Sequence, residues 1–346
     1  MALPATAKQV TVTKRGLNYR ECTEIRNVPV PNPQAGQVLV KNKFVGINAT
    51  DVNISSGRYF VDPTLKPPFI AGLEGIGPIV AVGEGVTNLK IGQAVAFLQY
   101  GTFAEYVIVP ADIAVPVPST DPSFMSIVIS GLTASVGLEE EGDLKAGKTV
   151  LVTAAAGGTG QFAVQIAKLA GCHVIGTCSS PEKADFLKSI GCDRVINYKK
   201  ESFREVITKE YSNKLDVVYE CVGKEMFDVS LQNLAIKGRL IVIGAISGYK
   251  DAEGANASEL IPKVPVGMEI VQKSASVRGF LLPLFPEKIP LHIATLAKQF
   301  AEGKIKVTLD KGENVAKGPF KGLEKTADAV EHLYSGKNIG KVIVEL

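Results

Sequence analysis

The run Thr149-Val-Leu-Val-Thr-Ala-Ala-Ala-Gly-Gly-Thr-Gly160 decides the fold of this chain. Its first half is almost continuously apolar, as is typical of a parallel strand buried on both faces. Its second half is rich in small residues. Apolar residues at helical spacing follow it, at Phe162, Ala163, Ile166 and Leu169. A buried strand, a glycine-rich turn and a helix, in this order, form the context that a dinucleotide-binding fingerprint requires.

The turn matches the fingerprint G-x-G-x-x-G with one departure. Ala155 stands in the place of the first glycine, whereas Gly157 and Gly160 keep the second and the third. Gly157 would let the backbone approach a pyrophosphate, and Gly160 would let helix and strand pack closely. The N-terminus of the helix would supply N–H donors and a partial positive charge. The sequence therefore predicts dinucleotide binding.

The choice of dinucleotide is made at the end of the second strand, in Thr177-Cys-Ser-Ser-Pro-Glu-Lys183. A site for NAD expects an acidic residue there to hold the ribose 2′-hydroxyl. This segment offers hydroxyls instead, among them that of Ser179, and Lys183 could meet a 2′-phosphate as a point charge. Tyr198, at the end of the third strand, could close the same pocket. NADPH is therefore preferred, although Glu182 argues mildly against it and Lys183 could instead be a solvated lysine of a first helical turn.

The rest of the chain divides into regions of different character. Short Val- and Ile-rich runs punctuated by Gly, Pro and Asn fill the first third and predict a compact all-β unit. From about Asp121 strands alternate with helices, which predicts an α/β fold with a doubly wound parallel sheet. The stretch from Lys250 to Lys273 lacks firm periodicity and is interpreted as a loop or lid. Beyond it we expect a helix over 288–302, a strand over 305–309, a helix over 323–334 and a strand over 341–345.

Composition excludes several functions. At roughly 150 residues per domain, 346 residues suggest two domains. A net charge of +3 without a basic cluster argues against nucleic acid. The apolar stretches are broken before the roughly 20 residues that a membrane helix needs. Three histidines and five scattered cysteines, with no C-x-x-C pair, do not form a structural zinc motif. The beginning of the chain shows no signal peptide, so we expect a reducing compartment and free thiols.

Several motifs, in this order, resemble the medium-chain dehydrogenase/reductase superfamily over essentially the whole chain. Within it the chain looks like the zinc-free quinone oxidoreductase and prostaglandin reductase branch. The motifs are Gly46-Ile-Asn-Ala-Thr-Asp51, Ser56-Gly-Arg-Tyr59, Gly72-Leu-Glu-Gly-Ile-Gly77, Ser130-Gly-Leu-Thr-Ala134, Thr177-Cys-Ser-Ser180, Gly336-Lys-Asn-Ile-Gly340 and Gly340-Lys-Val-Ile-Val344, together with the glycine loop. The resemblance implies a GroES-like β-rich domain over 1–125, to which 304–346 return, and a Rossmann-type NADP-binding domain over 126–303.

The resemblance also lets the zinc question be asked by position. Zinc alcohol dehydrogenases of this superfamily have a cysteine ligand where this chain has Asn48 and a histidine where it has Leu73. The cysteine-rich lobe that follows in those enzymes is missing after about Phe97. Neither an amide nor an alkyl side chain replaces those ligands, so we expect no metal.

The resemblance further implies a set of residues that contact the cofactor. Thr133 matches a position near the nicotinamide, Thr159 lies in the pyrophosphate turn, and Ser179, Lys183 and Tyr198 match the adenosine-phosphate pocket. Phe280, Leu281 and Leu282 match a strand whose backbone meets the carboxamide. The remaining expected contacts are Cys221, Ile243, Tyr249 and Asn338. For the apolar members, plain core packing is the alternative.

The expected reaction follows from the missing ligands. Without a zinc ion to polarise an alcohol, oxidation of alcohols is disfavoured, whereas hydride addition to the β-carbon of an enone needs only donors for the developing enolate. Tyr59 and Asn48 are the expected donors, and Tyr249 is a rim residue. The resemblance implies a reductase of 15-oxoprostaglandins or similar lipid enones. A quinone reductase is the alternative within the same fold, and an NADPH-binding structural or RNA-associating protein is the alternative of another class. Leu260, Ile261, Val264, Val266 and Met268 suit an apolar substrate.

Two further expectations rest on the resemblance. Relatives are often dimers joined through their nucleotide domains, sometimes by an edge strand such as Ser276–Leu282, so we expect a homodimer. We expect a cytoplasmic location, with the peroxisome as the alternative. The last residues, Val-Glu-Leu346, are not a Ser-Lys-Leu signal.

Overall fold

The computed structural model describes residues 3–58, 65–249 and 262–346. The chain forms two compact units. The first consists of Met1–Ile129 and Leu309–Leu346, and the second of Ser130–Thr308. The limits expected from the sequence, 125/126 and 303/304, lie a few residues before these. The first unit is therefore discontinuous in sequence.

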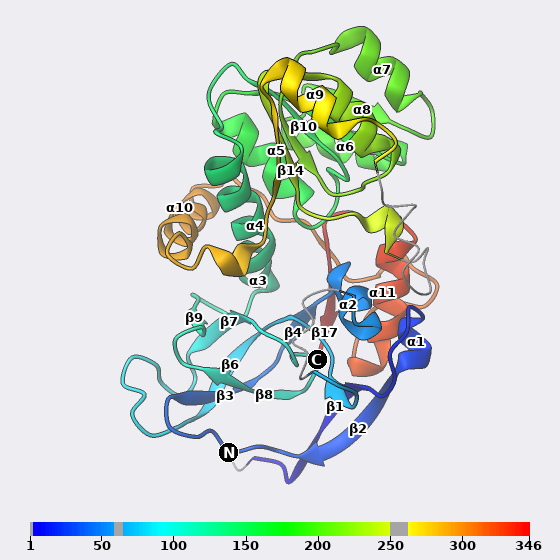
Figure 1. Ribbon diagram of the computed structural model, residues 1–346. Coiled ribbons are helices and arrows are strands. Elements are labelled where there is room, and N and C mark those ends of the chain that lie inside the picture. Colours follow the sequence, from blue (N-terminus) through cyan, green and yellow to red (C-terminus); the bar gives the residue numbers. More distant parts are fainter. Residues whose placement is uncertain (1–2, 59–64, 250–261) are drawn as a thin grey trace. The chain divides into compact units, whose positions relative to one another are not determined.

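The second unit is built on a parallel sheet of six strands (Figure 1). Their order is β12-β11-β10-β13-β14-β15, so the chain starts in the middle and winds outward in both directions. The strands are β10 (Thr149–Val152), β11 (His173–Cys178), β12 (Arg194–Asn197), β13 (Leu215–Glu220), β14 (Leu234–Val242) and β15 (Ser276–Gly279). All neighbouring pairs in this sheet are parallel. The doubly wound α/β fold expected from the sequence is confirmed.

Helices surround this sheet (Figure 1). Two of them begin at serine caps: the Ser180 hydroxyl accepts the N–H of Lys183, and the Ser202 hydroxyl accepts that of Glu205. Pro181 follows the first cap, where its missing N–H costs nothing. The helices of this unit are α4 (Leu132–Val136), η2 (Gly137–Glu141), α5 (Gly160–Leu169), α6 (Pro181–Ser189), α7 (Phe203–Glu210), α8 (Glu225–Gln232), η3 (Ile246–Gly248), α9 (Val266–Lys273), η5 (Leu282–Leu284) and α10 (Ile289–Ala301).

The first unit is β-rich, as expected. The all-β interpretation missed the short helices that precede residue 127, whereas the helix expected over 323–334 is present. Its strands are β1 (Thr6–Val12), β2 (Thr23–Pro29), β3 (Gln37–Lys41), β4 (Phe44–Gly46), β5 (Phe69–Ile70), β6 (Glu74–Val82), β7 (Ala94–Leu98), β8 (Tyr106–Pro110), β9 (Val115–Pro116), β16 (Leu309–Asp310) and β17 (Lys341–Glu345). The helices are α1 (Tyr19–Cys22), α2 (Thr50–Ser56), α3 (Pro122–Ser126), η6 (Leu323–Lys325) and α11 (Thr326–Tyr334). The π-helical turn η1 (Ile127–Gly131) contains the limit between the units.

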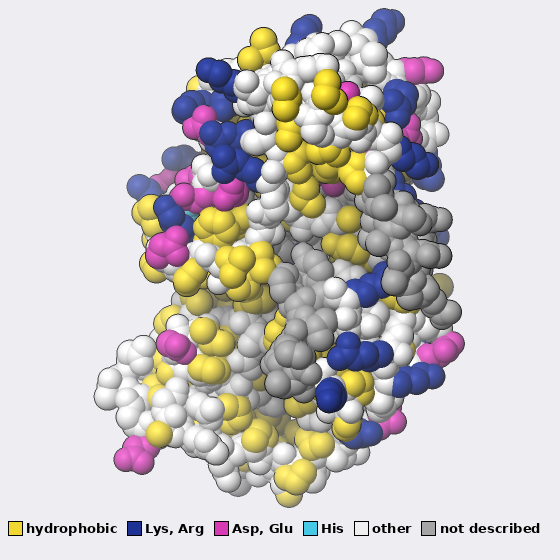
Figure 2. All heavy atoms as spheres, in the orientation of Figure 1, with side chains coloured by type: hydrophobic (Ala, Val, Ile, Leu, Met, Phe, Trp, Pro, Cys, Tyr) yellow, Lys and Arg dark blue, Asp and Glu magenta, His cyan; other side chains and the backbone are white. Residues whose placement is uncertain are grey.

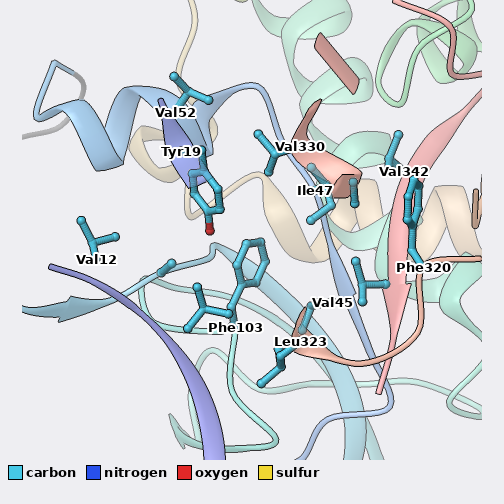
Figure 3. Packing of buried hydrophobic residues seen from close by; sticks show 14 residues of the cluster. Val12, Tyr19, Val45, Ile47, Val52, Phe103, Phe320, Leu323, Val330 and Val342 are labelled. Atoms are coloured by element: carbon cyan, nitrogen blue, oxygen red, sulfur yellow. The ribbon is translucent and has the colours of Figure 1, made fainter. Parts of the chain in front are cut away.

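The C-terminal strands close the first unit. In its larger sheet the order β16-β17-β4-β6 places the last strand beside strands formed early in the chain. The side chains of β17 share a core with the N-terminal elements. Val342 of β17 belongs to the same cluster as Val45, Tyr19 and Phe103, and the last two lie next to each other in Figure 3. This core positions the ends of β17, β4 and β6, where Asn48, Glu74 and Lys341 form a polar cluster.

The segment before β16 differs from the expected strand over 305–309, because only its last residue is in the sheet. The side-chain amide of Gln165 both donates to and accepts from the backbone of Lys306, at 2.9 and 2.8 Å. Gln161, one turn earlier on α5, does the same for Thr308 at 3.0 and 2.8 Å. Two buried glutamines thus replace a neighbouring strand as hydrogen-bond partners of this segment. We call these hydrogen bonds of Gln161 and Gln165 the glutamine ladder. It ends at Thr308, the last residue of the second unit.

Three other expectations need correction. Val266–Lys273 is a helix, α9, although the stretch 250–273 lacked firm periodicity; residues 250–261 lie outside the described part. The edge strand expected over Ser276–Leu282 ends at Gly279, because the chain enters the turn η5 at Leu282, with Pro283 as its second residue. The third expectation is that the apolar stretches are too short for a membrane helix. The run Pro122–Glu141, however, is helical throughout. By length and apolarity it could cross a membrane, but 78% of its most apolar window is buried, as core helices commonly are.

The glutamine ladder predicts a stability effect. Gln165→Leu would leave the partly buried N–H and C=O of Lys306 without their glutamine partners and should lower the free energy of unfolding by about 1–3 kcal/mol. Urea unfolding checks this. Gln272→Leu, at an exposed position of α9, is the control and should change it by less than about 0.5 kcal/mol. Equal stabilities of the two variants would contradict the ladder.

Candidate functional site: a dinucleotide loop and a polar cluster

The glycine loop is tied to the end of the neighbouring strand β11. The N–H of Ala154 donates to the Thr177 hydroxyl at 3.1 Å, and the N–H of Ala155 donates to the Thr177 carbonyl at 3.2 Å. Ala154 adopts a left-handed backbone with φ of 48°, a strained conformation for a residue with a side chain. The loop is therefore held in one shape before any ligand arrives.

The two retained glycines have different roles. A Cβ on Gly160 would lie 2.5 Å from the Ala154 carbonyl oxygen and 2.7 Å from the Cα of Ala155. Gly160 is thus required for close packing inside the protein. A Cβ on Gly157 would meet only the Ala154 carbonyl oxygen, at 3.2 Å, so packing within the protein does not demand a glycine there. This pattern fits a glycine kept for the approach of an external group.

The helix that follows the loop presents an uncapped N-terminus. Thr159 occupies the N-cap position, but its side chain does not cap α5. Its hydroxyl donates to the Ser130 carbonyl at 3.1 Å and lies 2.7 Å from the Tyr219 hydroxyl. Burial raises the pKa of Tyr219 well above its usual range, so this phenol stays neutral and donates to Thr159. The N–H groups of Gln161 and Phe162 donate to the Gly157 and Thr159 carbonyls at 3.2 and 3.1 Å. The positive end of the α5 dipole lies at this turn, where it favours an anion such as a pyrophosphate.

The residues expected to choose between NADPH and NADH meet at the ends of β11 and β12. The N–H of Tyr198 donates to the Cys178 carbonyl at 3.1 Å, which places Tyr198 beside Ser179. Lys183 lies in the first turn of α6, where its N–H donates to the Ser180 cap, and the residue is only 8% exposed. It is therefore not the solvated lysine that the sequence left as an alternative. No carboxylate ends β11, where an NAD site would have one.

The ends of β13 and β14 carry the next group of expected contacts. The Cys221 N–H donates to the Thr153 hydroxyl at 2.8 Å, and the Ile243 N–H donates to the Glu220 carbonyl at 2.8 Å. The Tyr249 hydroxyl accepts the N–H of Ala245 at 2.9 Å. Burial, and then the neighbouring Glu220, raise the pKa of Cys221 well above its usual range. The Cys221 side chain is therefore a neutral thiol and not a nucleophile.

Glu220 was missed in the sequence, although it organises this loop. Its buried carboxylate accepts the N–H groups of Val222 and Gly223 at 2.9 Å and lies 3.2 Å from the Thr153 hydroxyl. Burial raises the pKa of Glu220 to about 7, against these hydrogen bonds, which lower it. The available signal was an acid at the end of the otherwise apolar run Leu215–Glu220.

The remaining expected residues lie in both units. Thr133 is on α4; Phe280, 7% exposed, stacks on Phe285 with ring centroids 5.2 Å apart. Leu281 is extended, whereas Leu282 begins the turn η5, so these residues are not one strand. Asn338, in the first unit, donates to the Gly340 carbonyl at 3.0 Å. Their contacts with a cofactor stay predictions.

Asn48 belongs to a buried polar cluster of the first unit. Its side-chain N–H donates to Glu74 at 2.8 Å, and its side-chain oxygen accepts from the Lys341 ammonium at 2.7 Å. Lys341 also forms an ion pair with Glu74. Sequence reasoning named only Asn48 of these three. The other expected donor, Tyr59, lies outside the described residues.

The polar cluster does not fit a catalytic zinc ion. Asn48 and Leu73 occupy two ligand positions, and an ammonium contacts the carboxylate of Glu74, where it would repel a metal cation. Within 3–58, 65–249 and 262–346, no group of three or more His, Cys, Asp or Glu side chains could hold a metal ion.

Comparison with known proteins identifies the class. The family described as alcohol dehydrogenase GroES-like domain matches residues 34–119, and the family described as zinc-binding dehydrogenase matches residues 158–298. The chain belongs to the medium-chain dehydrogenase/reductase family.

Particular relatives narrow the class. The chain is 50% identical to prostaglandin reductase-3 of Mus musculus, over 100% of this chain and 91% of the relative. It is 44% identical to a probable quinone oxidoreductase of Leishmania amazonensis, over 100% of both chains. The structure of Escherichia coli quinone oxidoreductase complexed with NADPH is similar with a TM-score of 0.83 and 28% identity, covering 98% of this chain and 100% of that one.

The two glycines of the loop predict different outcomes of substitution. Gly160→Ala forces a Cβ into backbone atoms and should cost about 1–3 kcal/mol of unfolding free energy. Gly157→Ala should cost less than about 1 kcal/mol, because one oxygen must move by a few tenths of an ångström. Urea unfolding of the ligand-free protein measures both. Equal losses would show that the loop does not pack as described.

Glu220 predicts a pH dependence of stability. Because the pKa of Glu220 is raised in the folded state, protonated Glu220 favours folding. This contribution to the free energy of unfolding is fully present below about pH 4.5 and is lost as pH rises through about 7. Between pH 5 and pH 8 the wild type should lose about 2 kcal/mol relative to Glu220→Gln, which buries no charge. Urea unfolding at the two pH values tests this. The control is Glu205→Gln, at an exposed position of α7; the same pH trend in both variants would contradict the assignment.

Proposed function

We propose that this protein is an NADPH-dependent reductase of the carbon–carbon double bond of α,β-unsaturated ketones. The observation that carries the proposal is the uncapped N-terminus of α5 behind Gly157 and Gly160, with the buried Lys183 and no carboxylate at the adjacent strand end. The mouse relative is named a prostaglandin reductase, which supports 15-oxoprostaglandins and similar lipid enones as the substrate class.

The residues of the second unit fit NADPH in a definite order. The N-terminus of α5 and the backbone at Gly157 would hold the pyrophosphate, while Ser179, Lys183 and Tyr198 would receive the 2′-phosphate. The loop fixed by Glu220 and the backbone at Phe280 would support the nicotinamide end. When bound, NADPH supplies the hydride that adds to the β-carbon of the substrate.

The chain itself mainly positions groups and stabilises charge. As the β-carbon gains a hydride, negative charge develops on the carbonyl oxygen of the substrate. Hydrogen-bond donors that face this oxygen lower the barrier. We assign this role to Asn48 and Tyr59, with Tyr249 at the rim, and we assign protonation of the α-carbon to solvent or a hydroxyl. Tyr59→Phe retains the ring and should lower kcat on an enone.

A quinone reductase is the second candidate. It is favoured by the probable quinone oxidoreductase of Leishmania amazonensis, whose whole length the chain covers. One experiment separates the two: oxidation of NADPH by the purified protein is followed with matched panels of enones, quinones and aldehydes. The proposal expects the highest kcat/KM with enones. A preference for quinones would favour the second candidate, and salt-dependent RNA binding without turnover would overturn both.

We also propose that the protein is a homodimer joined through its second unit. Strand β15 lies at an edge of the parallel sheet, with one side unpaired in that sheet, and edge strands commonly pair with another chain. Leu284 and Leu291, which follow in the same unit, are 72% and 70% exposed. Analytical ultracentrifugation should give twice the mass of 36.7 kDa, and Leu284→Lys with Leu291→Lys should shift it toward the monomer. A monomeric wild type would contradict the proposal.

Lys183 predicts a selective loss of NADPH affinity. Lys183→Met keeps most of the buried stem but removes the charge, so KM for NADPH should rise about tenfold while KM for NADH stays the same. Lys188→Met, on the same helix with a side chain that is 67% exposed, is the control and should change neither. An unchanged KM for NADPH in Lys183→Met would exclude the assignment.

A further inference from the structure

Three adjacent strands of the first unit bring one lysine, one glutamate and one asparagine together. Lys341 is the first residue of β17, Glu74 is the first residue of β6, and Asn48 follows the end of β4, which lies between these strands. Lys341 is 3% exposed and Glu74 is fully buried. Two opposite charges are thus removed from water on either side of one amide.

The contacts leave the amide a single orientation. The Lys341 ammonium can only donate, and it meets the Asn48 side-chain oxygen at 2.7 Å. The Glu74 carboxylate can only accept, and it meets the Asn48 side-chain nitrogen at 2.8 Å. A flipped amide would place donor against donor and acceptor against acceptor. The main chain of Asn48 is held as well, because its N–H donates to Asp51 at 2.8 Å.

Gly46 leaves the space that the Glu74 carboxylate occupies in this cluster. A Cβ on Gly46 would lie 2.3 Å from Oε1 of Glu74, the same oxygen that accepts from Asn48. Any other residue at position 46 would displace the carboxylate. Buried ion pairs seldom add stability compared with apolar residues of the same volume, so stability alone does not account for this cluster.

The cluster leaves one N–H of Asn48 weakly used. Its side-chain nitrogen carries two hydrogens. One is donated to Glu74, and within the part of the chain that the structure describes the other meets the Gly46 carbonyl alone, at 3.4 Å. An ammonium that donates to the oxygen of an amide draws electron density from its nitrogen, so the remaining N–H becomes a stronger donor.

We propose that Lys341 is a positioning residue that, with Glu74, orients and polarises the Asn48 amide toward the oxygen of an α,β-unsaturated carbonyl substrate. This inference rests on the function proposed above. The lysine itself does not touch the substrate. It strengthens the hydrogen bond that the Asn48 amide donates to the substrate oxygen, where negative charge develops. No bond to Lys341 is made or broken.

The kinetic test is a double-mutant cycle with Lys341→Met and Asn48→Ala, assayed with NADPH and an enone. Each single variant should lower kcat about tenfold and leave KM for NADPH unchanged, and the double variant should be no slower than Asn48→Ala. Lys337→Met, an exposed lysine of the same C-terminal segment, is the control and should match the wild type. An unchanged kcat in Lys341→Met, or losses that multiply in the double variant, would overturn the proposal.

Removal of Lys341 alone leaves Glu74 buried without its charge partner, so this variant could fail to fold. In that case Lys341→Met is combined with Glu74→Gln, which removes both charges and should still lower kcat, because the polarising ammonium is gone. Wild-type kcat in this combined variant would contradict the role of the lysine.

A spectroscopic test does not depend on turnover. In protein labelled with ¹⁵N-asparagine, the side-chain signals of Asn48 are assigned by their loss in Asn48→Ala. They should move in Lys341→Met, or in its combination with Glu74→Gln, and stay in place in Lys337→Met. Signals that do not move would overturn the positioning role. If the wild type reduces no enone while the signals move as expected, the proposed function fails and the orientation of the amide by Lys341 stands.

Discussion

The close approach of the α5 N-terminus to the glycine loop is the constraint on which the second unit depends. Gly160 stands where any side chain would enter the backbone of Ala154 and Ala155. This contact lets α5 begin directly behind β10, while Thr177 ties the same loop to β11. Strand, loop and helix therefore form one rigid support. It leaves the helix N-terminus open to an anion and sets the neighbouring strand ends, with Lys183 and Glu220, around it.

Both units share a second feature, which is the burial of charge at the ends of strands. Glu220 organises its loop through backbone N–H groups, whereas Glu74 is compensated by Lys341. The resemblance to zinc alcohol dehydrogenases implies a metal ligand in those enzymes at the position of Asn48. Here the positive charge is part of the chain. This difference suits a reaction in which charge develops on an oxygen that hydrogen bonds can stabilise.

The sequence predicted the parts of the fold that rest on local patterns. The strand predicted over 341–345 is β17, with the predicted limits, and the helix predicted over 288–302 is α10, which is one residue shorter at each end. Long-range features escaped prediction. The backbone of the segment before β16 is hydrogen-bonded by Gln161 and Gln165, which lie more than 140 positions away. Helix α9 was missed because its eight residues are too few for a periodic pattern to stand out. Among the site residues, glycines and strand-end positions could be found by motif. Lys341 and Glu74 could not, because their burial depends on three strands that meet only in the folded unit.

Addition of the hydride to the carbon–carbon double bond can be measured directly, because the labelled hydride marks the carbon that receives it. The protein is given NADPH deuterated at the transferred position together with an α,β-unsaturated ketone, and the product is analysed by NMR. We expect a saturated ketone with deuterium at the β-carbon. Deuterium on the carbonyl carbon of an allylic alcohol would show that the hydride reduces the carbonyl group instead.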